Sequence, residues 1–257
     1  MKATRIEFRN RFWIIMAIYV LGFVAPWDFV LHLDGAGPNG AGNAHVWGLL
    51  AVLLSQGGAM SIAAAFNLLL AVAIACALAG AWLRTWGSAY LGADVMRDTS
   101  MRSDGVVADG PYRYVRNPLY LGSWLNLLAL ALLMPASGAV FAIAMLIGFH
   151  LRLILGEEAF LREKLGEPYA AYCAKVSRIL PALRKPRSQE RDLGHPPPKP
   201  RWGQAALAEI FMWGSAVSFA VLGWRYNATL LLQWVLVSLG VALVVKAFAK
   251  REPQPAG

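Results

Sequence analysis

Two long stretches of the sequence contain no formally charged residue. No Asp, Glu, Lys or Arg occurs from Gly35 to Leu83 or from Leu119 to Leu151. A helix on the surface of a soluble protein carries a polar face, whereas a helix that crosses a bilayer needs about 20 mainly apolar residues. The chain is therefore predicted to be an integral membrane protein of the all-α class, built as a polytopic bundle of helices.

Positive charges are grouped between the apolar segments. Of the 24 Lys and Arg residues, four lie in residues 1–11, five in 84–118, eleven in 152–201 and three in 246–251. About six spans place all these groups on one side of the membrane, as the positive-inside rule requires. The predicted spans cover residues 12–33, 61–83, 118–134, 138–155, 205–223 and 228–246.

This arrangement also predicts orientation and location. Both termini face the cytoplasm, and the net charge of +9 reflects membrane orientation rather than nucleic-acid binding. Arginine outnumbers lysine by 17 to 7 and alanine is abundant, which is typical of a bacterium with a GC-rich genome. The expected location is a bacterial inner membrane.

Three further segments divide the chain. Residues 46–56 are apolar but too few to cross a bilayer, so they are predicted to be interfacial or re-entrant. The turn from Pro135 to Gly138 joins two spans into a hairpin that brings residues 118 and 155 together at the cytoplasmic surface. A Pro-rich linker over residues 187–203 separates a membrane core (1–186) from a C-terminal pair of transmembrane helices (204–257), which is expected to be a scaffold.

The first cluster of candidate site residues runs from Gly110 to Gly122, where a cytoplasmic loop enters the third span. Pro118 fits the first position of a helix, and Asn117 fits the N-cap. A helix N-terminus carries free N–H groups and partial positive charge, to which Arg113 and Arg116 add two cations. An anionic group is expected to bind there.

A simpler interpretation of this cluster exists. The two arginines could only anchor the span at phospholipid head groups, and the tyrosines Tyr112, Tyr114 and Tyr120 could form an aromatic belt at the interface. The density of tyrosines beside two glycines, which permit close approach of a ligand, favours a binding site.

The second cluster follows the fourth span. Apolar and aromatic residues recur at three- and four-residue steps from residue 157 to 176, which predicts an amphipathic helix on the cytoplasmic membrane surface. Its polar face, with Glu157 and Glu158, is predicted to complete the binding site. The alternatives are a solvated ion-pair network for the two acids and a snorkelling end residue for Arg152.

A metal site is not predicted. The four histidines are scattered without ligand spacing, and Cys76 and Cys173 support neither a disulfide framework nor a thiolate metal site. The glycine-rich stretch from Gly35 to Gly42 lacks the lysine and the hydroxyl residue of a phosphate loop.

Together the two clusters resemble the isoprenylcysteine carboxyl methyltransferases and the related membrane phospholipid methyltransferases. These families carry Gly-Pro-Tyr-Arg-x-x-Arg-His-Pro-x-Tyr-x-Gly, a helical hairpin, and then a Glu-Glu helix with two tyrosines and a Val-x-Arg-x-x-Pro ending. The resemblance covers residues 82–183. Two positions depart from the pattern: Asn117 replaces the family histidine, which removes a titratable group, and Leu165 replaces a phenylalanine.

The resemblance implies transfer of a methyl group from S-adenosylmethionine to a lipophilic acceptor, with the cofactor between the two clusters. The implied cofactor-binding residues are Tyr112, Arg113, Arg116, Asn117, Pro118, Tyr120, Gly122, Glu157, Glu158, Tyr169 and Tyr172. Two residues are catalytic candidates: Arg152 would orient an acceptor carboxylate, and Glu157 would take the proton of an acceptor amine. The sequence leaves the choice of acceptor open.

Two other functions compete with this interpretation. The NADPH-dependent sterol-type membrane reductases have a similar Arg-His-Pro-Asn-Tyr stretch, but Leu119 replaces its asparagine here, and the Glu157-Glu158 pair favours a methyltransferase. The third possibility is a non-catalytic membrane scaffold whose cytoplasmic cations bind anionic lipid.

Overall fold

The computed structural model describes residues 3–34, 45–91, 108–181 and 199–248, and these residues contain helices but no strand. The α-helices are α1 (Arg5–Arg9), α2 (Arg11–Val24), α3 (Asp28–Leu31), α4 (Val46–Gln56), α5 (Ile62–Leu91), α7 (Pro118–Ala131), α8 (Ala136–Leu165), α9 (Glu167–Lys175), α10 (Trp202–Ala208), α11 (Ile210–Leu222) and α12 (Ala228–Phe248). Two short 3-10 helices complete the set: η1 (Gly110–Arg113) and η3 (Gly223–Arg225). The predicted all-α class is confirmed for this part of the chain, whereas most of the predicted linker lies outside the described residues.

Three helices are long and apolar enough to cross a membrane: α5, α8 and α12. A fourth span is counted if α10 and α11 are taken together, although they are bent by 67° at their junction. The chain is thus an integral membrane protein, but the six predicted spans are not confirmed. Helices α2 and α7 have only 14 residues each. Pro26 follows the end of α2 and cannot extend a helix, so the predicted first span, residues 12–33, was drawn too long.

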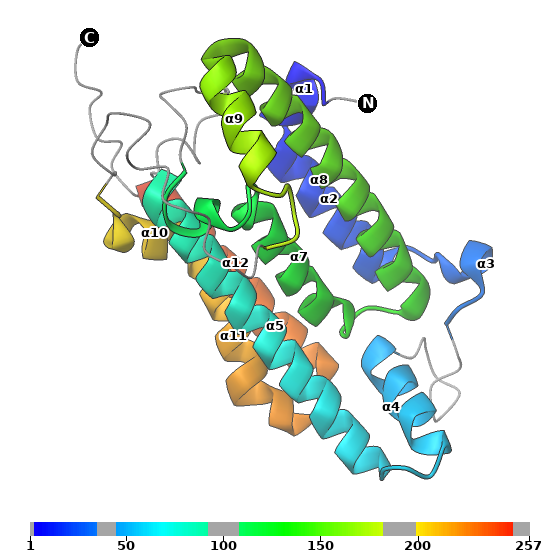
Figure 1. The fold of residues 1–257 in the computed structure, drawn as a ribbon. Helices are drawn as coiled ribbons and strands as arrows, with labels where there is room; N and C mark the ends of the chain where they lie inside the picture. Colours follow the sequence, from blue (N-terminus) through cyan, green and yellow to red (C-terminus); the bar gives the residue numbers. More distant parts are fainter. Residues whose placement is uncertain (1–2, 35–44, 92–107, 182–198, 249–257) are drawn as a thin grey trace.

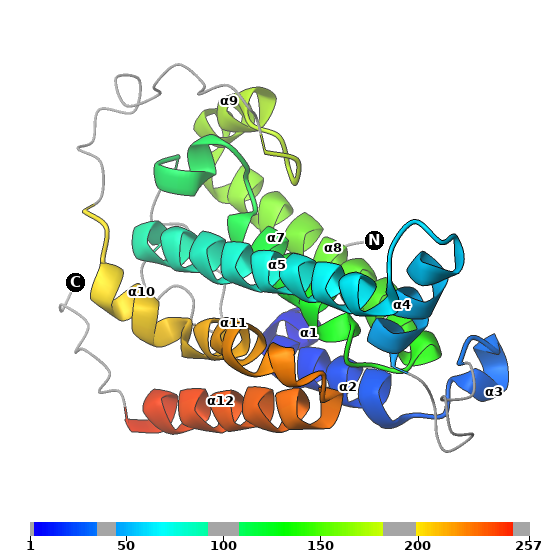
Figure 2. The same ribbon diagram turned by 90° about the horizontal axis from the view of Figure 1, so that it is seen from below.

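Short helix α7 lies in the middle of the bundle. On one side it packs against α5, which also packs against α11, and on the other side it contacts α8, which pairs with α2 (Figure 1). Figure 2 shows α11 lying between α5 and α12. Two hydrophobic clusters meet at α7, because Leu130 belongs to the cluster around α5 and α11 while Leu127 belongs to the cluster around α2 and α8.

The end of α7 opposite the candidate site is closed by α4. The first two amides of α4, those of Val46 and Trp47, donate to the carbonyls of Met134 and Leu132 at 2.9 and 3.0 Å. Free amides at one helix start thereby satisfy free carbonyls at another helix end. With 11 residues, α4 is too short to span a bilayer, as predicted for residues 46–56.

The other end of the bundle carries α1, η1 and α9 (Figure 1). Here the structure corrects one expectation: no single amphipathic helix covers residues 157–176. Instead α8 continues without a break to Leu165, Gly166 adopts φ +57°, and α9 begins at Glu167. Glycine tolerates positive φ, so the chain reverses there and α9 folds back toward η1.

Candidate active site

Helix α7 begins where the sequence predicts, with Pro118 as its first residue. Asn117 occupies the N-cap position, but its side chain does not cap the helix. The amide nitrogen Nδ2 instead donates to the Arg178 carbonyl oxygen at 3.2 Å and to Glu158 Oε1 at 3.4 Å. The predicted capping role is therefore wrong, because the side chain binds the Glu158 carboxylate of α8 and the Arg178 carbonyl, which follows α9, instead of the free amides of α7.

Glu158 is the centre of a buried ion-pair group. The residue is 5% exposed, and its carboxylate accepts hydrogen bonds from Nε and Nη2 of Arg178 at 3.1 and 2.9 Å. Arg116 Nε lies 3.6 Å from the same carboxylate, and the Arg116 backbone amide donates to the Ser177 carbonyl at 2.9 Å. Two cations thus surround one carboxylate, which leaves this part of the site with a net positive charge.

Glu157 and Tyr120 join the two predicted clusters directly. The Tyr120 hydroxyl donates to Glu157 Oε1 at 3.0 Å, so the start of α7 lies beside the end of α8 as the hairpin predicts. The Tyr120 ring meets His150 edge-on, with ring centroids 5.0 Å apart. His150 in turn accepts a hydrogen bond on Nδ1 from Trp124 Nε1 at 2.9 Å, which fixes the imidazole behind Tyr120.

The tyrosines of α9 pack against η1. Tyr169 and Tyr172 are buried, with ring centroids 5.9 Å apart, and the Tyr172 hydroxyl donates to the Tyr112 carbonyl at 2.8 Å. Burial raises the pKa of the Tyr112 and Tyr172 hydroxyls above the usual value for tyrosine. Both groups therefore stay protonated at neutral pH and can donate hydrogen bonds.

Two donors in this region are buried with neither a hydrogen-bond partner nor an ion-pair partner among the described residues. They are the hydroxyl of Tyr112, a residue that is 7% exposed, and Nη1 of Arg116, whose side chain is 10% exposed. A buried polar group without a partner costs free energy comparable to that of a lost hydrogen bond. These two groups are suited to a ligand that brings an acceptor, such as a carboxylate.

Three predicted site residues have other contacts that account for them. Arg113 Nη2 pairs with Asp109 Oδ1 at 2.9 Å. A Cβ on Gly122 would lie 2.8 Å from the carbonyl oxygen of Gly80, so this glycine permits close packing of α7 on α5. Arg152 Nη2 pairs with Glu7 at 2.9 Å, and the pKa of Glu7 is lowered to about 2, mainly by this contact. Their roles toward cofactor or acceptor stay predictions.

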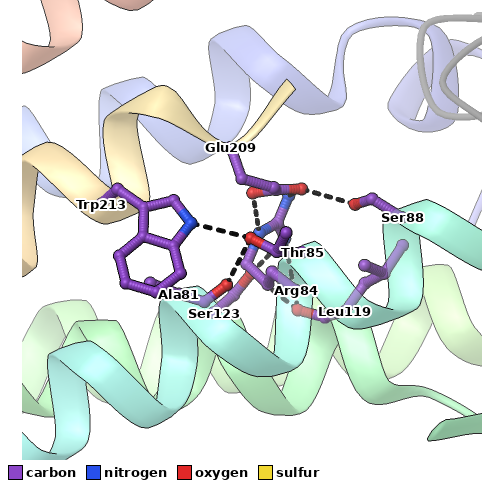
Figure 3. Close-up of polar contacts among 8 residues, drawn as sticks. All are labelled: Ala81, Arg84, Thr85, Ser88, Leu119, Ser123, Glu209 and Trp213. Carbon is purple, nitrogen blue, oxygen red and sulfur yellow. Dashed lines mark hydrogen bonds and ion pairs between the residues drawn. The ribbon is translucent and has the colours of Figure 1, made fainter. Parts of the chain in front are cut away.

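Two cations near the site were not among the residues predicted from the sequence. Arg11, at the start of α2, interacts electrostatically with Glu157. In the sequence it belongs to a basic N-terminal segment, which indicated only the orientation of the chain in the membrane. Arg84 lies within α5 and pairs with Glu209 at 2.6 Å (Figure 3). An ionisable residue inside an apolar segment is itself a sign of function, and this sign was available in the sequence for both Arg84 and Glu209.

Comparison with known proteins supports the family prediction. The family model described as phospholipid methyltransferase matches residues 68–168, which extend from α5 to the start of α9 and include η1, α7 and α8. No curated protein and no solved structure matches the chain. The resemblance to the membrane phospholipid methyltransferases is thus confirmed over residues 68–168 of the chain.

Proposed function

We propose that this protein transfers a methyl group from S-adenosylmethionine to a lipophilic acceptor at the cytoplasmic face of a bacterial inner membrane. The family match supports methyl transfer in general. The observation that carries the choice of cofactor is the pair of buried donors without partners, the Tyr112 hydroxyl and Arg116 Nη1. S-adenosylmethionine brings hydrogen-bond acceptors, its carboxylate among them, that such donors lack, and when bound it supplies an electrophilic methyl group on a sulfonium.

The residues around these donors fit the rest of that cofactor. The two carboxylates of α8, Glu157 and Glu158, are acceptors for an ammonium or for ribose hydroxyls. Buried aromatic rings of Tyr169 and Tyr172 line the same region and suit a cationic sulfonium. In this proposal Arg178 holds Glu158 in place, because it binds the carboxylate through two nitrogens.

The acceptor is proposed to reach the site from the bilayer. Glu157 is half-buried at the end of a span, and Leu151, about two turns below it on α8, exposes 37% of its surface toward the surroundings of the bundle. An amphiphilic molecule held along this face would present its polar end to Glu157 and Tyr120. Methyl transfer is an in-line displacement, so the main task of these residues is to align the acceptor atom with the methyl donor.

The chemistry at Glu157 distinguishes the two acceptor classes. An amine must lose a proton as it is methylated, and Glu157, already hydrogen-bonded to Tyr120, is the candidate that takes it. A carboxylate needs no base but needs a cation to orient it. Arg152, proposed for that role, is bound to Glu7 and would have to exchange this contact for the substrate. Glu157→Gln should lower the turnover of an amine acceptor by about 100-fold or more and leave a carboxylate acceptor largely unaffected.

Isothermal titration of the full chain in detergent tests the cofactor assignment. S-adenosylmethionine and S-adenosylhomocysteine should bind saturably, and Arg116→Ala should weaken binding about tenfold, the effect of losing one charge-assisted hydrogen bond. Arg162→Ala is the matched control, because Arg162 is an exposed cation near the end of the same α8. Binding of NADPH but not of the methionine derivatives would favour the reductase instead. Binding of none of the three would favour the scaffold.

A further inference from the structure

The break between α10 and α11 holds a buried carboxylate. Glu209 lies at this junction, is 2% exposed, and sits where the two helices bend by 67°. Its carboxylate accepts hydrogen bonds from Arg84 Nε at 2.6 Å, from Arg84 Nη2 at 3.0 Å and from the Ser88 hydroxyl at 2.8 Å (Figure 3). A break in a span is tolerated where its polar groups are buried in protein, and here they face α5.

Packing of the C-terminal helices on α5 does not by itself require this ion pair. Apolar contacts already connect them, since Ala216 and Phe219 of α11 are fully buried in the same cluster as Leu70 of α5. Replacing a buried ion pair with apolar residues is often neutral or stabilising. Packing of the C-terminal helices on α5 therefore does not explain the Arg84–Glu209 ion pair, and a further role of this pair is expected in the contacts of Arg84.

The third side-chain nitrogen of Arg84, Nη1, indicates such a role. Nη1 donates to the carbonyl oxygen of Leu119 at 3.2 Å and to the Ser123 hydroxyl at 2.7 Å, both near the start of α7 (Figure 3). A planar guanidinium that binds Glu209 through two nitrogens has its third nitrogen fixed in direction. Arg84 thus connects the break in the C-terminal helices with the beginning of α7.

The turn held by Arg84 is the turn that carries candidate site residues. Asn117 and Pro118 precede Leu119, and Tyr120, which donates to Glu157, follows it. Gly122 makes this contact possible, because a Cβ there would lie 2.6 Å from Cγ of Arg84. A displacement of Arg84 would be passed to Tyr120 through the backbone of a single helical turn.

We propose that Arg84 is a positioning residue for the methyl-transfer site and that Glu209 holds it in its working direction. The C-terminal helices then complete the site instead of serving only as a scaffold. This inference rests on the proposed function for its effect on turnover. The positioning of α7 is a structural statement that can be tested separately.

Hydrogen–deuterium exchange of the full chain in detergent tests the positioning directly. Glu209→Gln keeps the side-chain volume but removes the charge and one acceptor, so the amides of residues 121–124 should exchange about tenfold faster. The matched control is Trp213→Phe. It removes the hydrogen bond from Trp213 Nε1 to Thr85 Oγ1 at 2.9 Å in the same α5–α11 interface without touching Arg84. Unchanged exchange in Glu209→Gln, or equal acceleration in both variants, would overturn the proposal.

A milder variant covers the case in which Glu209→Gln does not fold. Ser123→Ala removes one acceptor of Arg84 Nη1 on α7, together with the hydrogen bond from the Ser123 hydroxyl to the Leu119 carbonyl, and leaves the ion pair with Glu209 intact. It should accelerate exchange in the same residues and nowhere in α11 or α12. Protection equal to that of the unchanged protein would show that Arg84 does not hold α7.

A kinetic measurement connects the positioning with the site. In Glu209→Gln, kcat for methyl transfer should fall about tenfold while the Kd of S-adenosylmethionine changes less than about twofold, because misplacement of Tyr120 affects alignment rather than cofactor binding. A proportional rise in Kd with unchanged kcat would contradict the inference. If the unchanged protein transfers no methyl group, the proposed function fails, whereas the exchange experiment still decides whether Arg84 holds α7.

Discussion

Gly122→Ala distinguishes two roles for the glycine that ends the first cluster. The sequence assigned it to close approach of the cofactor, whereas the structure places it against α5. A Cβ there would lie 2.6 Å from Arg84 Cγ and 2.8 Å from the Gly80 carbonyl oxygen. Neither neighbour moves easily, because Gly80 contributes backbone and Arg84 is held by Glu209. Helices α5 and α7 would have to separate.

The size of the effect follows from this overlap. Overpacking of a tight contact costs about 1–3 kcal/mol, and overlap with the backbone of α5 places this site in the upper part of the range, about 2–3 kcal/mol. Alanine recovers up to about 1 kcal/mol of helix propensity over glycine, so the net loss is about 1–2 kcal/mol. For a chain of this size each kcal/mol corresponds to about 2–4 °C in Tm, which predicts a Tm lowered by about 2–8 °C in the absence of any ligand.

Thermal unfolding in detergent without cofactor is the assay, with Gly148→Ala as the matched control. Gly148 lies in α8, and an added Cβ would meet no atom within 4 Å. The control should be neutral or gain about 0.5–1 kcal/mol. An unchanged Tm for Gly122→Ala together with weaker binding of S-adenosylmethionine would refute the packing argument and restore the cofactor role.

Two further predictions concern the contacts that hold the candidate site. The pKa of Glu7 is lowered to about 2, chiefly by Arg152, so the stability this pair contributes is present above the ordinary pKa of 4.5 and is lost as the pH falls toward 2. Tm measured between pH 7 and pH 3 should therefore fall less steeply in Glu7→Gln than in the unchanged protein, and identical slopes would contradict this contribution. Tyr172→Phe removes the hydrogen bond to the buried Tyr112 carbonyl and should cost about 0.5–1.5 kcal/mol in thermal unfolding. No change in Tm would mean that the carbonyl finds another donor.

The sequence correctly predicts those helices that are marked by features of neighbouring residues. Charge-free windows and proline positions locate α5, the long part of α8, and the start of α7 at Pro118. The same features overestimated the number of spans, because apolar composition does not distinguish a helix exposed to lipid from a helix packed within the protein. Leu127 and Leu130 of α7 are buried inside the bundle although α7 is too short for the length expected of a span.

The candidate site was predictable only in part, for a physical reason. The meeting of Tyr120 with Glu157 follows from the hairpin, which places the ends of two neighbouring helices side by side. Ion pairs between distant segments leave no periodic trace in a sequence. Arg84 and Glu209 are separated by 125 residues, and Arg152 and Glu7 by 145, so their pairing depends on tertiary packing alone.

Transfer of a labelled methyl group tests the central claim most directly. Proteoliposomes containing the full chain would be incubated with a membrane lipid extract and S-adenosylmethionine labelled in its methyl group, and label would be counted in the organic phase. We expect a labelled lipophilic product, with a rate about tenfold lower for Arg116→Ala at subsaturating cofactor. A folded protein that binds S-adenosylmethionine but leaves all label in the aqueous phase would contradict the account.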